Sequence, residues 1–393
     1  MDAWRRRFIR NILAITFALQ VPFAVLVGAT LSHIEGVGRY AAAITALLVF
    51  ALHTPMFFRL ANWTDHERSG FARIWLFETP FYIHFVASLL AGPLGWLALG
   101  VLGAMRLSHH AVAVVPVLGA LYAVCLAMGA YAVLVRRFWV RTRRVDVAID
   151  DLDPSLEGLR IVQLSDLHCG PYMPKSYLSY LARRANAENP DAVMLTGDMV
   201  THGVGYVDDV SHLVRSLRGK LGVFASMGNH DYFGAVNEID EAMARGGATV
   251  LRNRGVSVEG PRGGSIHIAA VDDYWTRRDD VDLALAMKTR TDGACVLISH
   301  DPDTFPRIAS RGDVDLVLSG HTHGGQFAVP FLARRWNLAR VRHKHTIGLY
   351  RERGTALYVH AGNGTSGPPA RFGVAPEIAV LTLRRATSSA PRA

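Results

Sequence analysis

Four long stretches in the first third of the chain contain no Asp, Glu, Lys or Arg, and they restrict the fold more than any other feature. The stretches cover residues 11–34, 40–58, 79–105 and 111–135. A helix needs about 20 mainly apolar residues to cross the hydrocarbon core of a bilayer, so each stretch is long enough to span a membrane. The sequence therefore predicts a transmembrane region of four helices within residues 1–144.

The arginines beside these stretches indicate an orientation. They cluster before the first stretch, between the second and third, and after the fourth, whereas the other two connections carry only Arg39 and Arg106. Positively charged loops stay in the cytoplasm, so everything after Val135 is predicted to lie inside a multi-pass inner-membrane protein. The run Arg5-Arg6-Arg7-Phe8 also resembles a twin-arginine export signal, which would place the rest outside. We favour the cytoplasmic orientation, because such a signal does not need the three spans that follow.

The net charge of +9 belongs to the membrane region. Residues 1–144 contain 14 Lys and Arg against 5 Asp and Glu, and the remainder contains 28 of each. The excess therefore reflects membrane topology, and no nucleic-acid partner is expected. The chain has 3 cysteines and no CxxC pair, which argues against a disulfide framework and against a thiolate zinc site.

The second part of the chain repeats one pattern: an apolar run, a small residue, and then a polar residue of the type that binds metals. The five apolar runs are residues 159–164, 192–195, 222–227, 295–298 and 314–318. Runs this continuous are typical of strands buried on both faces, and helix-like segments at 175–186 and 207–217 separate some of them. Alternating strands and helices predict an α/β domain over residues 145–385, with a site where strand ends open into loops.

Five short motifs follow these runs. They are Asp166-Leu167-His168, Gly197-Asp198, Gly228-Asn229-His230-Asp231, Ser299-His300 and Gly320-His321-Thr322-His323. Each motif alone is common in turns, so the prediction depends on all five occurring in order at strand ends. Two divalent cations about 3.5–4 Å apart need oxygen and imidazole ligands of this kind, with a carboxylate bridging the pair. Such a pair lowers the pKa of a shared water and yields a hydroxide near neutral pH.

At these motifs the sequence resembles the calcineurin-like metallophosphoesterase family. Through Gly324-Gly325-Gln326 and Gly364-Thr365-Ser366-Gly367 it is similar to the membrane-anchored bacterial branch of that family. The resemblance implies a four-layer α/β/β/α sandwich and a hydrolase that acts on phosphoric ester bonds.

The resemblance also implies a role for each site residue. Asp166, His168 and His323 would hold the first metal, and Asn229, His300 and His321 would hold the second. Asp198 would bridge the two. His230 would contact the phosphate and assist the leaving group, and Asp231 would orient His230. The two divalent metal ions could be Mn, Fe, Zn or Mg, because such sites accept several metals.

The expected function is hydrolysis of a phosphate monoester, diester or pyrophosphate linkage by a metal-bridging hydroxide. A phospholipid or a nucleotide-linked lipid is the preferred substrate class, and the oligomeric state stays open. The alternative is a non-catalytic metal-binding membrane sensor or scaffold, against which the intact His230 argues.

Two segments remain. Residues 331–353 contain seven Lys and Arg against one acidic residue, Glu352, with aromatic and aliphatic residues between them. This segment is either a surface for anionic lipid or a solvated basic face, and the sequence leaves both open. Residues 386–393 are predicted to form a disordered tail.

Overall fold

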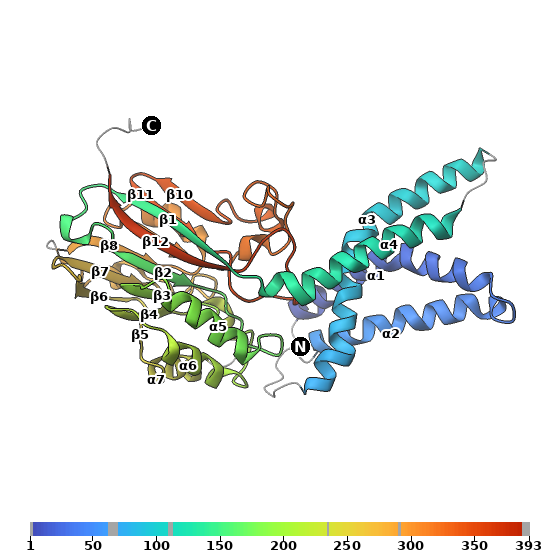
Figure 1. Cartoon of the computed structure of the whole chain (residues 1–393), viewed down its shortest axis with the longest axis horizontal. Coiled ribbons are helices and arrows are strands. Elements are labelled where there is room, and N and C mark those ends of the chain that lie inside the picture. Colours follow the sequence, from blue (N-terminus) through green and yellow to red (C-terminus); the bar gives the residue numbers. More distant parts are fainter. Residues whose placement is uncertain (1–2, 62–69, 109–112, 234–235, 290–291, 387–393) are drawn as a thin grey trace. The chain divides into compact units, whose positions relative to one another are not determined.

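The computed structural model describes residues 3–61, 70–108, 113–233, 236–289 and 292–386. The chain forms two compact units, the first ending at Arg136 and the second beginning at Arg137 (Figure 1). Of the predicted tail at 386–393, all but Ala386 lies outside the described residues.

The first unit is helical. Its elements are α1 (Ala3–Ser32), η1 (Gly38–Tyr40), α2 (Ala41–Ala61), η2 (Arg73–Glu78), α3 (Thr79–Leu107), α4 (Val114–Ala130) and η3 (Tyr131–Val135), with η4 (Arg136–Phe138) at the junction. Within the described residues, three helical stretches are long and apolar enough to cross a membrane: Ile9–Ser32, Arg73–Leu107 and Val114–Phe138. They correspond to three of the four predicted spans. The remaining one, at 40–58, lies in α2, whose apolar part Gly38–Thr54 is shorter, so that span stays a prediction.

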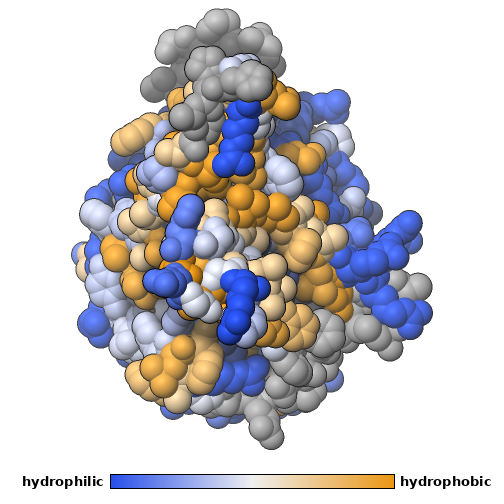
Figure 2. All heavy atoms as spheres, turned by 90° about the vertical axis from the view of Figure 1, so that its right-hand side faces the viewer, coloured by the Kyte–Doolittle hydropathy of each residue, from blue (hydrophilic) through white to orange (hydrophobic). Residues whose placement is uncertain are grey.

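The surface of the helical unit is apolar, as membrane helices require. Large hydrophobic side chains stand exposed on several helices: Ile15, Phe17, Leu47, Phe50, Leu97, Val101 and Val124. Figure 2 shows apolar side chains over much of the face that it presents. Inside the unit, glycines allow close helix packing, since a Cβ on Gly129 would lie 2.6 Å from the Ile83 carbonyl oxygen.

The second unit contains two six-stranded mixed sheets. The first sheet has the strand order β1 (Arg141–Ile149), β12 (Glu377–Arg385), β2 (Arg160–Leu164), β3 (Ala192–Thr196), β4 (Gly222–Ser226) and β5 (Ala248–Val250). The second has the order β10 (Gly348–Glu352), β11 (Thr355–Val359), β9 (Leu316–Ser319), β8 (Asp292–Ile298), β7 (Ser265–Ala270) and β6 (Arg254–Glu259). The five predicted strands are therefore β2, β3, β4, β8 and β9.

The two sheets pack face to face, and helices cover their outer faces (Figure 1). Along β3, Met194 points into the core between the sheets, whereas Val193 and Leu195 pack under the outer helices. The outer helices on the first sheet are α5 (Lys175–Asn186), α6 (Val207–Ser216) and α7 (Val236–Arg245), and those on the second are α8 (Val281–Leu285) and α9 (Phe305–Ala309). This four-layer arrangement explains the continuous apolar runs, because both faces of the central strands are buried.

The border between the units differs from the predicted one. The arginines of residues 141–144 resemble a cytoplasmic flank, so the sequence assigns these residues to the membrane region. In the structure they begin β1, which pairs in parallel with β12 from Arg141 onward. Most side chains of β1 are at least partly exposed, and only its last residues are buried in the core.

Candidate metal centre

The predicted site residues stand just beyond the ends of five strands. Asp166 follows β2, Asp198 follows β3 and Asn229 follows β4. These three strands are mutually parallel, so their carboxyl ends share one edge of the first sheet. His300 and His321 follow β8 and β9, which are also parallel neighbours, in the second sheet. The site is therefore built where equivalent edges of the two sheets meet.

The backbone at this edge is held in an uncommon conformation. Five site residues are left-handed, with φ between 46° and 66°: Asp166, His168, Asp198, His321 and His323. Such a conformation costs a non-glycine residue on the order of 1 kcal/mol or more, so it persists only where the surroundings enforce it. Here the Asp166 amide donates to the Gly197 carbonyl, and the His168 amide donates to the Asp198 carbonyl, both at 3.0 Å. These hydrogen bonds hold the loops after β2 and β3 together.

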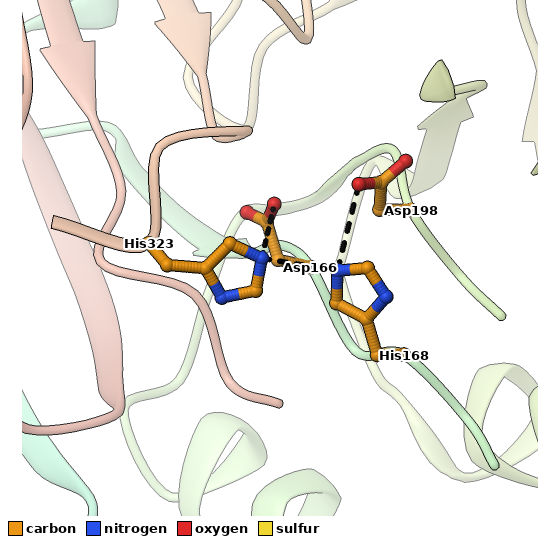
Figure 3. A group of neighbouring side chains, drawn as sticks. All are labelled: Asp166, His168, Asp198 and His323. Atoms are coloured by element: carbon orange, nitrogen blue, oxygen red, sulfur yellow. Dashed lines mark hydrogen bonds and ion pairs between the residues drawn. The ribbon is translucent and has the colours of Figure 1, made fainter. Parts of the chain in front are cut away.

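Four side chains form the first group, Asp166, His168, Asp198 and His323, whose ligand-type atoms lie within 4.8 Å of one another. Figure 3 shows that they converge from three loops. His168 Nε2 lies 3.5 Å from Asp198 Oδ2, and His323 Nε2 lies 3.4 Å from Asp166 Oδ1. The two Nε2 atoms are 3.0 Å apart. Two imidazole nitrogens and two carboxylates therefore surround one small volume.

A second group shares Asp198 with the first. Asp198, His300 and His321 place ligand-type atoms within 4.8 Å of one another. His300 Nε2 lies 3.3 Å from Asp198 Oδ2, the same oxygen that faces His168. Asn229 joins this group, since its Oδ1 lies 2.9 Å from His321 Nδ1. One carboxylate oxygen thus stands between the two groups.

The donor atoms fit a pair of divalent cations. Asp166 Oδ2 is buried and has no hydrogen-bond partner within the described part of the chain, and the buried His300 Nε2 makes only a long contact with Asp198 Oδ2 at 3.3 Å. His300 Nδ1 is engaged by the Thr196 carbonyl at 2.7 Å, which leaves Nε2 directed at Asp198. A buried polar atom without a partner is costly, and a cation would satisfy both atoms. Carboxylate, amide and imidazole donors are also the set that Mn, Fe, Zn and Mg share.

The electrostatics prepare most of the imidazoles for metal binding. Burial lowers the pKa of His168 to about 3, and it also lowers the pKa values of His321 and His323 well below their usual range. These rings are therefore neutral at pH 7 and offer a lone pair. Burial disfavours charge on Asp198 and His300 too, but their mutual attraction outweighs it, holding the pKa of Asp198 low and that of His300 high.

His230 lies beside the first group. Its ring centroid is 4.6 Å from that of His168, and its Nδ1 lies 2.8 Å from the Thr201 carbonyl oxygen. We expected Asp231 to orient this ring. Instead, the Asp231 carboxylate accepts hydrogen bonds from the amides of Gly228 at 2.9 Å, Met199 at 2.8 Å and Val200 at 3.2 Å. The Thr201 carbonyl fixes the ring, and Asp231 ties together the loops that carry Asp198 and Asn229.

Arg371 is a site neighbour that sequence reasoning missed. Its side chain is fully buried, and its guanidinium donates to the carbonyls of Gly364 and Ala361 at 2.6 to 3.0 Å. Its Nη2 also lies 3.3 Å from His323 Nδ1. The Gly364 amide in turn donates to the Asp166 carbonyl at 2.7 Å. Arg371 therefore supports both His323 and the loop beneath Asp166, and a lone arginine in a loop gives no sequence signal of this.

A further acid and histidine lie behind His321. Asp301 Oδ2 is 3.8 Å from His321 Nε2, and His343 Nδ1 pairs with Asp303 Oδ2 at 3.0 Å. Asp301, Asp303 and His343 together could hold a cation by proximity, but Asp303 is exposed and already paired. We interpret Asp301 as the carboxylate that faces His321 Nε2, and the pair of Asp303 and His343 as a structural contact.

Comparison with known proteins agrees with this geometry. Residues 159–325 match the model of the calcineurin-like phosphoesterase family. An uncharacterized metallophosphoesterase of Bacillus subtilis is 31% identical over 273 residues, covering 68% of this chain and 94% of the relative. One of Helicobacter pylori is 30% identical over 273 residues, covering 66% of this chain and 70% of the relative. A zebrafish (Danio rerio) transmembrane protein with metallophosphoesterase domain is 34% identical over 255 residues, covering 62% of this chain and 57% of the relative. The chain belongs to the calcineurin-like metallophosphoesterase family.

Proposed function

We propose that this protein is a membrane-anchored phosphoesterase that hydrolyses a phosphate monoester, diester or pyrophosphate linkage at two divalent cations. One observation carries the proposal. A single buried oxygen, Asp198 Oδ2, is approached by His168 from one group and by His300 from the other. A carboxylate oxygen shared by two ligand groups suits a two-metal site, in which the cations lie about 3.5–4 Å apart.

The ligand assignment follows the two groups. Asp166, His168 and His323 would hold one cation, Asn229, His300 and His321 the other, and Asp198 both. When bound, the cations would lower the pKa of a shared water and offset charge on the phosphoryl oxygens. The chain itself fixes the ligands: Asp166 Oδ1 accepts from the His321 amide at 2.9 Å, and Asp198 Oδ1 accepts from the His230 amide at 2.8 Å.

His230 is the proposed catalytic side chain. With Nδ1 donating to the Thr201 carbonyl, its Nε2 is left for the substrate, and Ser366 Oγ lies 3.5 Å from it. As an imidazolium, with a proton on each ring nitrogen, His230 would contact a phosphoryl oxygen through Nε2 and pass that proton to the leaving group. Its place beside His168 puts it next to the proposed metals without making it a ligand.

We propose that the enzyme works at the cytoplasmic face of the inner membrane. The arginine distribution supports this orientation, because the chain beyond Val135 follows the cluster Arg136, Arg137, Arg141, Arg143 and Arg144. An enzyme held there meets lipid-linked and nucleotide-linked phosphoesters, which are the proposed substrate classes.

The function is tested by turnover of bis-p-nitrophenyl phosphate. The full chain is purified in detergent, stripped of metal and reloaded with Mn, Fe, Zn or Mg. We expect turnover with at least one metal and none with Asp198→Ala. Absence of turnover with all four metals, in a protein that binds two per chain, would favour the sensor or scaffold.

A further inference from the structure

A folded loop leaves the metal centre and returns to it. We call residues 328–344 the basic loop; it begins shortly after His323 and ends just after His343. The ring of His343 lies 5.3 Å from that of His321, measured between centroids. Both ends of the basic loop are therefore attached beside proposed metal ligands.

Hydrogen bonds fix the backbone of the basic loop. The Val329 amide donates to the Trp336 carbonyl at 2.9 Å, and Ala328 forms an antiparallel bridge with Asn337. The Asn337 side chain donates to the Ala333 carbonyl at 2.7 Å and to Thr346 Oγ1 at 3.0 Å. The loop is thus an ordered element. These hydrogen bonds determine which of its side chains point outward.

The side chains that this loop exposes are apolar and large. Six of the twelve large hydrophobic side chains exposed in the described part of the second unit lie here: Val329, Phe331, Leu332, Trp336, Leu338 and Val341. Phe331 is 103% exposed and has a left-handed φ of 66°, which is uncommon for an aromatic residue. Singly exposed apolar side chains are common, but six on one loop of 17 residues are typical of an interaction site.

Cations lie among the apolar side chains along the basic loop. The basic loop carries Arg334, Arg335, Arg340, Arg342 and Lys344 and contains no Asp or Glu. Lys344 pairs with Glu352 at 2.7 Å, but the four arginines form no ion pair with any carboxylate in the described ranges. Arg334 donates to the Leu349 carbonyl at 2.8 Å and Arg342 lies over the ring of Trp275, so these contacts leave the positive charges without a carboxylate. Aromatic and aliphatic residues among such arginines are typical of segments that lie in the interface of an anionic bilayer.

The chain also keeps this unit close to a bilayer. The candidate span Val114–Phe138 is separated from the start of β1 at Arg141 by only Trp139 and Val140. So short a connection reaches about 10 Å at most. The second unit therefore stays within reach of the membrane surface. That surface offers both the anionic charge and the apolar layer that the basic loop requires.

We propose that the basic loop inserts Phe331 and Trp336 into an anionic membrane surface and so places the metal centre at the lipid head groups. This inference rests on the proposed function, and it narrows the substrate to an amphiphilic phosphoester drawn from the bilayer. The loop then aids the reaction by raising the local concentration of that substrate, while the metal ligands stay as they are.

The insertion is tested with an environment-sensitive fluorophore on Phe331→Cys in the full chain. Cys125, Cys169 and Cys295 are buried, so the added thiol reacts selectively, and unsubstituted protein measures background. Met287→Cys, at a side chain 70% exposed outside the loop, is the matched control. In nanodiscs containing phosphatidylglycerol, we expect blue-shifted emission and quenching by doxyl lipids at 331 only. A water-like spectrum at 331, or equal quenching at 287, would overturn the proposal.

A kinetic comparison tests the consequence for substrate. Arg335→Gln/Arg342→Gln is assayed on hexadecyl p-nitrophenyl phosphate in phosphatidylglycerol nanodiscs and on soluble methyl p-nitrophenyl phosphate. Each cation near an anionic surface contributes roughly a fivefold effect, so the KM for the long-chain ester should rise about tenfold or more. The methyl ester should be unaffected, and Arg183→Gln/Arg215→Gln should change neither KM.

The outcomes separate this inference from the proposed function. Equal KM changes on both esters, or none on either, would contradict membrane docking while leaving the phosphoesterase intact. If unsubstituted protein hydrolyses neither ester, hydrolysis of diesters is excluded from the proposed function, and the fluorophore at 331 still reports whether the loop enters the bilayer.

Discussion

At the scale of single residues, the proposed metal ligands are distinct from the groups that hold them in place. The imidazoles of His168 and His323 face each other, while Arg371 and the Thr201 carbonyl hold the surrounding groups from behind. This division predicts that removing a ligand, a proton donor or a support has a different outcome in each case.

His230→Ala should retain metal and lose activity. The side chain is proposed to donate a proton and to contact phosphate, so kcat should fall by roughly 10²–10⁴. The loss should be smaller for p-nitrophenyl esters than for alkyl esters, because a good leaving group needs little protonation. Metal content measured by plasma emission on the same preparation provides the check, and a metal-free variant would make His230 a ligand.

Arg371→Lys should destabilise the second unit. The lysine cannot replace donors to two carbonyls, Gly364 and Ala361, and it leaves a buried charge poorly paired. We expect the free energy of unfolding to fall by about 2–4 kcal/mol in urea titrations. Arg183→Lys, on the exposed face of α5, should change it by less than about 0.5 kcal/mol. If Arg371→Lys and the unsubstituted protein had equal free energies of unfolding, the buried contacts of Arg371 would contribute little to stability.

Metal binding should release protons. Attraction to Asp198 raises the pKa of His300 although burial opposes it, and burial raises the pKa of Asp166 to about 6. In the metal-free protein His300 is therefore protonated at pH 7, and a cation must displace that proton. Affinity should fall as pH falls from 8 to 6. Calorimetry in two buffers of different ionisation enthalpy should give at least one proton released per chain, and zero would contradict the assignment of His300.

At the scale of elements, the sequence predicted the strands that carry the site better than the strands that do not. β2, β3 and β9 are buried on both faces and end in ligand-type residues, so composition and position agree. β12 is also apolar, but it runs antiparallel to β2, and its carboxyl end leaves at the other edge, where no site residue follows. β5 has only 3 residues, too few for a periodic signal.

The site residues, like the strands, could be predicted only in part from the sequence. Strand-end positions could be predicted for Asp166, Asp198, His300 and His321, because parallel strands bring their carboxyl ends together. The contact of Asp231 could not, since its three amide donors come from backbone that only the folded loops bring within reach. The family resemblance implied that Asp231 orients His230, whereas the Asp231 carboxylate accepts hydrogen bonds from the amides of Met199, Val200 and Gly228.

At the scale of the whole molecule, the chain joins candidate membrane helices to a sandwich that carries the candidate metal centre. The orientation is predicted by the arginine distribution and can be measured directly. Reporters active only inside or only outside the cell are fused after Val135 and after residue 393. Both positions should report the cytoplasm. Outside activity at both would establish the export reading of Arg5-Arg6-Arg7-Phe8.

The central claim is that two cations join the two sheets through one carboxylate. Asp198 comes from the first sheet, and His300 and His321 come from the second. Asp198→Ala should therefore abolish binding of both metals together with activity, because its loss breaks the pair. Asp209→Ala removes a buried carboxylate that pairs with Lys175 at 3.1 Å, outside both groups, and serves as the control.

The decisive measurement is the metal content of Asp198→Ala by plasma emission spectroscopy. Our account predicts two metals per chain in the unsubstituted protein and in Asp209→Ala, and close to none in Asp198→Ala. Two metals retained in Asp198→Ala would contradict it, because Asp198 would then not be the shared ligand.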